Sequence, residues 1–104
     1  MIFNKDNFKQ EVEDSAGIVL VDFFADWCGP CQIMGPIVEA MIKENNDQNV
    51  KIGKLNIDDA QEIASNHNVM SIPTFLVFKG GKVVGRKTGY CDKEELSQLI
   101  NKSK

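Results

Sequence analysis

Three segments of the chain show the apolar patterns that are typical of β-strands. Ile18–Ala25 (IVLVDFFA) is nearly continuously apolar and rich in β-branched and aromatic residues, so we predict a strand covered on both faces. Val50–Ile57 alternates between apolar and polar residues, which predicts a strand with one apolar face. Thr74–Lys79 is a third predicted strand, and Gly80-Gly81 predicts a tight hairpin turn to a partner strand at Lys82–Thr88.

Segments with helical spacing of apolar residues separate these strands. Asn4 is placed to cap a first helix that contains Phe8 and Val12, after a short strand at Ile2-Phe3. A longer helix starts at the cysteines and ends at Asn45-Asn46-Asp47. Its single apolar face consists of Ile33, Met34, Ile37, Val38, Met41 and Ile42.

Two more helices are predicted in the second half of the chain. Asp58 is a candidate cap for a short helix that runs through Asn66. Asp92, with Glu95 three residues later, resembles a capping box that opens a final helix. Strands separated by helices imply right-handed parallel crossovers, and the hairpin adds antiparallel strands. We therefore predict an α/β fold, with a single mixed β-sheet flanked by helices on both faces.

Composition and charge narrow the range of functions. The chain has 104 residues, which predicts a single domain spanning 1–104. Its net charge of −3 argues against general nucleic-acid binding, which requires a basic face. The start of the chain lacks the apolar segment of a signal peptide, and the apolar runs are too short to span a membrane. We expect a cytoplasmic protein that does not enter the membrane.

The three cysteines are too few for a secreted disulfide framework, and they favour a reducing cytosol. Cys28 and Cys31 are separated only by Gly29 and Pro30, within the stretch ADWCGPCQIMGP at Ala25–Pro36. Two chemistries use this spacing. One is a metal site with further ligands from elsewhere, and the other is a dithiol that opens and closes as a disulfide.

A helix that begins within Trp27–Cys31 favours the dithiol. Cys28 then lies at the N-terminal edge of the helix and Cys31 one turn further on the same side, at a separation that permits a disulfide. Pro30 suits the first turn, where a missing N–H is tolerated. The helix dipole and its free N–H groups favour a thiolate at Cys28. Cys28 is therefore the predicted nucleophile toward a partner's disulfide, and Cys31 the thiol that resolves the mixed disulfide.

Cys31 must lose a proton before it attacks, and Asp22 is the candidate acceptor. Asp22 interrupts a strand whose two faces are expected to be buried, and burial would raise its pKa toward a useful range. The alternative for Asp22 is a solvated or hydrogen-bonded carboxylate. Lys54, on the next strand, is a candidate neighbour of Asp22 that would tune the redox site, although its spacing also fits an ordinary exposed lysine.

The run FFADWCGPC resembles the thioredoxin family, and the resemblance covers nearly the whole chain. The other matching positions are Asp22, Pro36, Lys54–Asp58 (KLNID), Ser71–Thr74 (SIPT), Phe78–Gly81 (FKGG) and Gly89. The resemblance implies a thioredoxin fold and a general protein-disulfide reductase in electron transport and cell redox homeostasis. It also implies no bound cofactor, a redox-active Cys28–Cys31 disulfide, a thioredoxin reductase and disulfide-containing proteins as partners, and a monomer.

Several site roles follow only from this resemblance. Gly29 and Pro30 would help to set the reduction potential. The Ile72–Pro73 bond would be cis and face the cysteines, and the Ile72 backbone would pair with the substrate chain like an added strand. The implied apolar docking patch consists of Trp27, Gly29, Pro30, Ile72, Pro73 and Gly89.

Two positions depart from the family pattern. Gln32 stands where the family usually has Lys or Arg, which removes a positive charge beside the cysteines and bears on partner choice. Cys91 follows Gly89-Tyr90. In one interpretation Cys91 is a small, partly buried residue, and in the other it is an exposed thiol open to glutathionylation or dimer formation.

Three other interpretations stay open. The first is a zinc module with the ligands Cys28, Cys31, Cys91 and His67. Its spacing lacks the second close cysteine pair of a zinc ribbon. The second is a binding subunit without redox turnover, against which the intact cysteines argue. The third is an oxidase or isomerase of the same fold, which would more often have an export signal and a His between the cysteines.

The excess of lysine over arginine suggests an AT-rich bacterial genome.

Overall fold

The structure is a computed structural model that describes all 104 residues. Its elements are β1 (Ile2–Phe3), a π-helical turn (Lys9–Glu13), β2 (Ile18–Phe24), α1 (Gly29–Glu44), β3 (Val50–Asn56), a 3-10 turn (Ile57–Asp59), α2 (Gln61–Asn66), β4 (Thr74–Lys79), β5 (Lys82–Thr88) and α3 (Lys93–Ser103). The five strands form one sheet in the order β1-β3-β2-β4-β5. β1, β3 and β2 run parallel, and β4 and β5 join in antiparallel pairs. The predicted mixed α/β sheet is confirmed.

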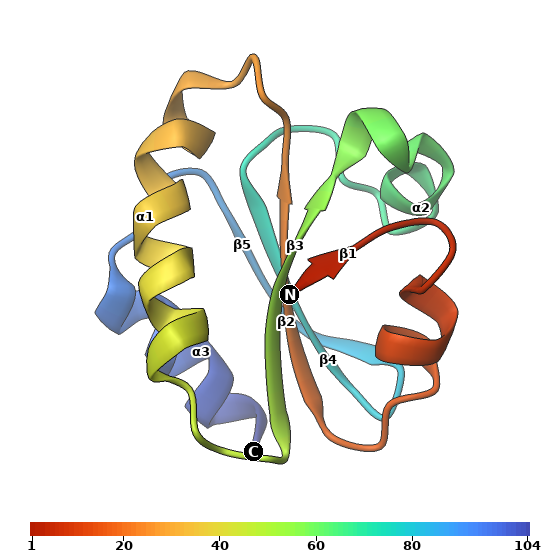
Figure 1. Ribbon diagram of the computed structural model, residues 1–104, viewed down its shortest axis with the longest axis vertical. Helices are drawn as coiled ribbons and strands as arrows, with labels where there is room; N and C mark the ends of the chain where they lie inside the picture. Colours follow the sequence, from red (N-terminus) through yellow and green to blue (C-terminus); the bar gives the residue numbers. More distant parts are fainter.

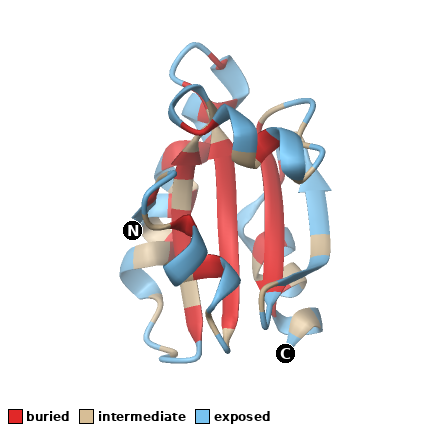
Figure 2. Cartoon of the chain, turned by 90° about the vertical axis from the view of Figure 1, so that its right-hand side faces the viewer, coloured by how far each residue is buried: buried red, intermediate tan, exposed pale blue.

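Helices cover both faces of this sheet (Figure 1). α1 and α3 lie on one face, and the π-helical turn and α2 lie on the other. The core is divided in the same way, into a cluster that includes Leu20 and Met34 and a cluster that includes Phe23 and Leu76. β2 lies in the middle of the sheet and is buried over residues 18–23, because alternate side chains enter the two clusters (Figure 2). The nearly continuous apolar run at this strand therefore reflects burial of both of its faces, as we predicted.

The first predicted helix is the element that differs most from expectation. The segment that contains Phe8 and Val12 is a π-helical turn at Lys9–Glu13, not an α-helix. Its wider winding is seen at Asp14, whose N–H donates to the carbonyl oxygen of Lys9, five residues earlier. Phe8 and Val12 are both buried in the cluster on this face. The packing of these two side chains therefore fixes a segment too short to form a regular helix by itself.

The prediction that Asp58 caps a helix is wrong. The segment is divided into the 3-10 turn and α2, and Asn56 caps the turn, because its Oδ1 accepts the Asp58 N–H at 3.0 Å. The two preceding strands also end one residue earlier than predicted, β2 at Phe24 and β3 at Asn56. The Asp58 carboxylate is therefore available for a partner elsewhere in the chain.

The C-terminal half agrees closely with the sequence pattern. β4 and β5 have the predicted bounds, with Gly80 and Gly81 at positive φ in the turn between them. The capping box is present, since Asp92 accepts the Glu95 N–H and Glu95 accepts the Asp92 N–H. β5 is a largely exposed edge strand (Figure 2). None of the helices has the length and apolar character needed to cross a bilayer.

Candidate active site

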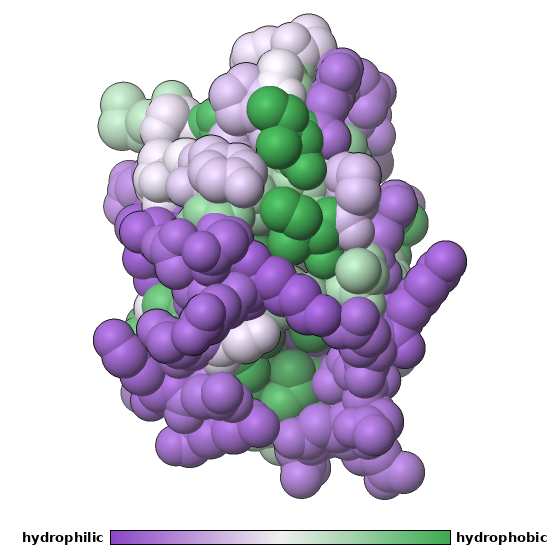
Figure 3. Space-filling view, turned by 90° about the vertical axis from the view of Figure 1, so that its left-hand side faces the viewer, coloured by the Kyte–Doolittle hydropathy of each residue, from purple (hydrophilic) through white to green (hydrophobic).

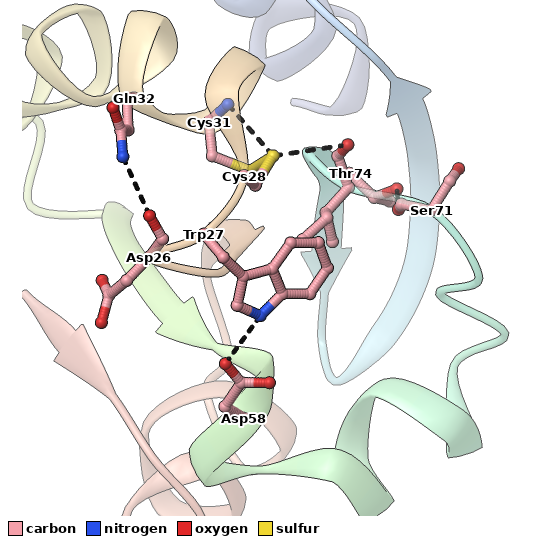
Figure 4. Close-up of a disulfide and its surroundings, with 9 residues drawn as sticks. Asp26, Trp27, Cys28, Cys31, Gln32, Asp58, Ser71 and Thr74 are labelled. Atoms are coloured by element: carbon pink, nitrogen blue, oxygen red, sulfur yellow. Dashed lines mark hydrogen bonds between the residues drawn. A yellow bond between two sulfur atoms is a disulfide. The ribbon is translucent and has the colours of Figure 1, made fainter.

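Cys28 and Cys31 lie at the N-terminus of α1 and are joined by a disulfide (Figure 4). Cys28 is the N-cap residue, α1 begins at Gly29, and Pro30 occupies the first turn, as predicted. The Cα atoms of the two cysteines are 5.2 Å apart. The Cys31 N–H donates to Cys28 Sγ at 3.2 Å. The helix N-terminus therefore presents a hydrogen-bond donor, and the positive end of its dipole, to the Cys28 sulfur.

The disulfide is set into a small apolar cluster. Both cysteines are 5% exposed. The cluster consists of Ala25, Cys28 and Cys31, with Phe24, Ile57 and Ile72 packed against it. Apart from the cysteines at the start of α1, these residues come from the end of β2, from the 3-10 turn after β3 and from the loop before β4. Three segments that are distant in the sequence therefore converge on the sulfur atoms.

The loop before β4 faces the disulfide directly. Its Ile72–Pro73 peptide bond is cis, as the resemblance implies. The Ile72 carbonyl oxygen lies 3.7 Å from Cys28 Sγ. The Gly89 N–H donates to the Pro73 carbonyl oxygen at 2.8 Å, so the loop after β5 is tied to the same place. Thr74 Oγ1 closes the turn by donating to Ser71 O at 2.6 Å.

The residues expected to form the docking patch differ in exposure. Trp27 is 69% exposed. Gly29 and Pro30 are also exposed, and Ile72 and Gly89 are partly buried. Pro73 is buried, lies directly before β4 and accepts a hydrogen bond from the Gly89 N–H through its carbonyl oxygen, and its place in the docking patch stays a prediction. On the face that carries α1 and α3, apolar side chains gather in the upper half, toward the disulfide end (Figure 3).

Trp27 has a partner that the sequence pattern does not predict. Its indole Nε1–H donates to Asp58 Oδ2 at 3.0 Å (Figure 4). Nearby, Gln32 Nε2 donates to the carbonyl oxygen of Asp26 at 2.9 Å. The two bonds hold the Asp26-Trp27 loop between α1 and the 3-10 turn. The only sequence signal for the first bond is the place of Asp58 in the KLNID run.

Asp22 is a buried, unpartnered carboxyl group. Its side chain lies in β2 with 1% exposure, and neither carboxyl oxygen has a hydrogen-bond partner. Burial raises the pKa of Asp22 from 3.8 to about 7, and the charge of Lys54 opposes part of this rise. The alternative of a solvated or hydrogen-bonded strand carboxylate is therefore wrong.

Lys54 lies beside Asp22 and is not an ordinary exposed lysine. It pairs in register with Asp22 across β2 and β3, and only 15% of its side chain is exposed. Its Nζ lies 4.7 Å from the centroid of the Phe24 ring and 3.8 Å from Glu39 Oε1. Lys54 and Cys31 line the same surface groove. The structure thus places a cation in the groove that Cys31 lines.

Cys91 and His67 lie away from the disulfide and from each other. Cys91 is a free thiol with 1% exposure in the cluster beneath α1 and α3. Burial, followed by the charge of Glu95, raises the pKa of Cys91 to about 11. His67 packs on Phe8 and Phe78, which belong to the cluster on the opposite face. The exposed-thiol interpretation of Cys91 and the four-ligand zinc interpretation are both wrong.

A disulfide at a helix N-terminus, beside an exposed aromatic ring, can open and close against a partner's sulfur atoms. The fold and the site define a protein of the dithiol–disulfide exchange class.

Comparison with known proteins gives the family. A family model described as Thioredoxin matches residues 1–102. The thioredoxin of Bacillus subtilis (strain 168) is 48% identical over 90 residues, which cover 86% of each chain. The thioredoxin of Chlamydia pneumoniae is 46% identical over 101 residues, 97% of this chain and 95% of the relative. The thioredoxin of Listeria monocytogenes serovar 1/2a is 47% identical over 92 residues, 88% of each chain. The chain belongs to the thioredoxin family, and it is a protein-disulfide oxidoreductase.

Proposed function

We propose that this protein is a general protein-disulfide reductase of the bacterial cytoplasm, which acts as a monomer and is re-reduced by a thioredoxin reductase. The observation that carries the proposal is the hydrogen bond from the Cys31 N–H to Cys28 Sγ at the start of α1. In the reduced protein the same N–H stabilises a Cys28 thiolate. The bacterial relatives, each named thioredoxin, support the proposal.

The cycle begins when the Cys28 thiolate attacks one sulfur of a target disulfide. That S–S bond breaks, a mixed disulfide forms, and the second target sulfur leaves as a thiolate. The Cys31 thiol then gives up its proton and attacks Cys28 Sγ, which releases the first target sulfur. The target gains two electrons, and the Cys28–Cys31 disulfide forms. The reductase returns two electrons to this disulfide, so no bound cofactor is needed.

Asp22 is the proposed acceptor of the Cys31 proton. With a pKa of about 7, its carboxyl group is present in both protonation states near neutral pH, as proton transfer in each direction requires. Lys54 lines the same groove as Cys31 and pairs in register with Asp22, so it lies close to both groups of the proposed proton transfer. Lys54 favours the carboxylate, and Gly29 and Pro30 complete the turn that sets the reduction potential.

The target chain would dock beside the cis peptide bond. The backbone N–H of Ile72 has no partner within the chain, and its carbonyl oxygen faces Cys28. Both groups are therefore free to pair with an extended target segment, as in strand addition. The exposed ring of Trp27 and the Gly29, Pro30 and Gly89 surfaces would lie against the target's side chains. Pro73 would act by holding Ile72 in place.

The test is catalysis of insulin disulfide reduction by dithiothreitol. Wild type should strongly accelerate precipitation of the insulin chains, and Cys28→Ser should abolish the acceleration. Cys31→Ser should instead accumulate a mixed disulfide with the target, because the resolving thiol is missing. Cys91→Ser is the matched control and should retain activity, since Cys91 is buried away from the site. No acceleration by wild type over dithiothreitol alone would overturn the proposal.

A further inference from the structure

The amino group of Lys54 rests against α1, although the residue starts beside Asp22 on the sheet. Lys54 and Asp22 are register partners on parallel strands, so their side chains leave the same face. Lys54 Nζ lies 4.7 Å from the centroid of the Phe24 ring and 3.8 Å from Glu39 Oε1. A Cβ on Gly35 would lie only 3.7 Å from the same Nζ. Gly35 and Glu39 are four residues apart on one face of α1, so the amino group follows that face.

Glu39 and Asp22 compete for this cation. Neither oxygen of the buried Asp22 carboxyl group has a partner, whereas the exposed Glu39 carboxylate pairs with Lys54. Neighbouring strands are about 5 Å apart, and the lysine stem is flexible enough to span that distance. An amino group released from Glu39 is therefore free to turn toward Asp22. There it would stabilise the carboxylate form of the buried group.

The other titratable groups around the site do not take the place of Lys54. Cys31 is held in the disulfide, and Cys91 is buried with its pKa raised to about 11, so neither carries charge at neutral pH. On the other side of Asp22, β4 supplies the uncharged Phe75. The charged groups on the surrounding elements are Lys43 and the Met1 amino group, in a groove that Glu39 also lines, Lys87, Asp92 and Glu95 around Cys91, and the Glu44–Lys93 pair. The charge of Lys54 is the one that opposes the desolvation of Asp22.

We propose that Glu39 is a positioning residue of the redox site, which holds Lys54 away from Asp22 and so keeps the buried carboxyl group able to bind a proton near neutral pH. The inference rests on the proposed role of Asp22 as acceptor of the Cys31 proton, and it adds the residue that sets the working pH of that step. Without Glu39, Asp22 would titrate at lower pH and would be a weaker base. Loss of the negative charge of Glu39 acts in the same direction.

The direct test is the titration of the Asp22 carboxyl group in the oxidised protein, followed by carbon-13 NMR of labelled aspartate. Asp22→Asn identifies the resonance by its loss. Glu39→Gln should lower the midpoint by roughly half a pH unit, the size expected of a weak, exposed ion pair. Glu44→Gln removes the same charge from α1, where Glu44 pairs with Lys93, and should leave the midpoint in place. No shift in Glu39→Gln, or an equal shift in Glu44→Gln, would overturn the inference.

A second background separates action through Lys54 from the direct field of Glu39. Lys54→Met keeps an apolar stem and removes the cation. In that background Glu39→Gln should shift the midpoint by less than half as much as it does alone. An equal shift in both backgrounds would overturn the inference, because Glu39 would then act by its own charge. A midpoint that stays above the ordinary aspartate value shows in each variant that Asp22 is still buried and the protein folded.

Stopped-flow release of a target from a preformed mixed disulfide connects this titration to the reaction. In Glu39→Gln the inflection of the release rate should move to lower pH by the same amount as the midpoint, whereas the attack by Cys28 should change little. A release profile that stays in place while the titration moves would overturn the role of Asp22 as acceptor, and with it the part of Glu39 in the reaction. Failure of wild type in the insulin assay would instead overturn the reductase function itself.

Discussion

Asp22 and Lys54 occupy the same register position on adjacent strands β2 and β3, yet no ion pair joins them. Lys54 Nζ is instead drawn toward Glu39 and the Phe24 ring. The cation therefore offsets only part of the desolvation of Asp22, and the pKa of the carboxyl group stays at about 7. The protein keeps a buried acid that exchanges protons near neutral pH, at a cost in stability.

That cost should appear as a pH-dependent stability difference in Asp22→Asn. Between pH 4 and 7 the folded state of wild type binds the Asp22 proton and the unfolded state releases it, so wild-type stability falls as pH rises through this window. We expect the oxidised variant to be more stable than wild type at pH 8, by at most about 4 kcal/mol, and equally stable below pH 4. Urea unfolding at several pH values measures the difference. Asp59→Asn is the exposed control, and lower stability of Asp22→Asn at pH 8 would contradict the argument.

The same variant should slow the resolving step. In wild type, release of a target from a preformed mixed disulfide should speed up as pH rises through about 7, because Asp22 becomes a carboxylate that accepts the Cys31 proton. In Asp22→Asn this inflection should be absent, and the rate at pH 7 should fall by roughly a hundredfold. Stopped-flow measurement of the two steps provides an internal control, since the attack by Cys28 should change little. An unchanged pH profile for release would rule out Asp22 as the acceptor.

The β4–β5 hairpin contains two glycines that should differ in their tolerance of a side chain. Gly80 and Gly81 have φ of 58° and 81°. A Cβ on Gly80 would meet open space, whereas a Cβ on Gly81 would fall on the carbonyl oxygen of Glu13. Gly80→Ala should cost about 1 kcal/mol from backbone strain alone. Gly81→Ala should cost about 2 kcal/mol more, because the backbone must move. Denaturant unfolding of the pair measures the clash, and equal costs would mean that the turn relaxes freely.

Cys91 should be unreactive in the native state. Its thiol is buried, and its pKa is raised to about 11, so the thiolate is scarce at pH 8. The oxidised, folded protein should give no colour with Ellman's reagent, and one thiol should titrate after unfolding in guanidinium. Cys91→Ser, which has no such thiol, supplies the blank. Rapid labelling of native protein would show that the α3 end of the core opens more readily than its packing indicates.

Local pattern was sufficient where each signal depends on neighbours in the chain. Asp92 and Glu95 form a capping box because both partners lie within one helical turn. Cys28 and Cys31 are brought together for the same reason, once α1 begins at Gly29. Local pattern failed at Asp58, where the predicted capping role within the segment competed with a hydrogen bond to a residue distant in the sequence. Asn56 takes the capping role and leaves the Asp58 carboxylate for Trp27.

The sequence by itself determined the alternation of strands and helices, the face that each element buries, and the cysteine pair at a helix start. These features depend on side-chain period and on contacts within a few residues. The tertiary structure alone decided that the Asp22 carboxyl group has no hydrogen-bond partner, that Lys54 pairs with Glu39 and not with Asp22, and that Pro73 is buried. Desolvation and pairing depend on every group within a few ångströms, whichever part of the chain supplies it. For that reason the cysteine pair was visible in the sequence, whereas the burial of Asp22 without a hydrogen-bond partner became visible only in the folded chain.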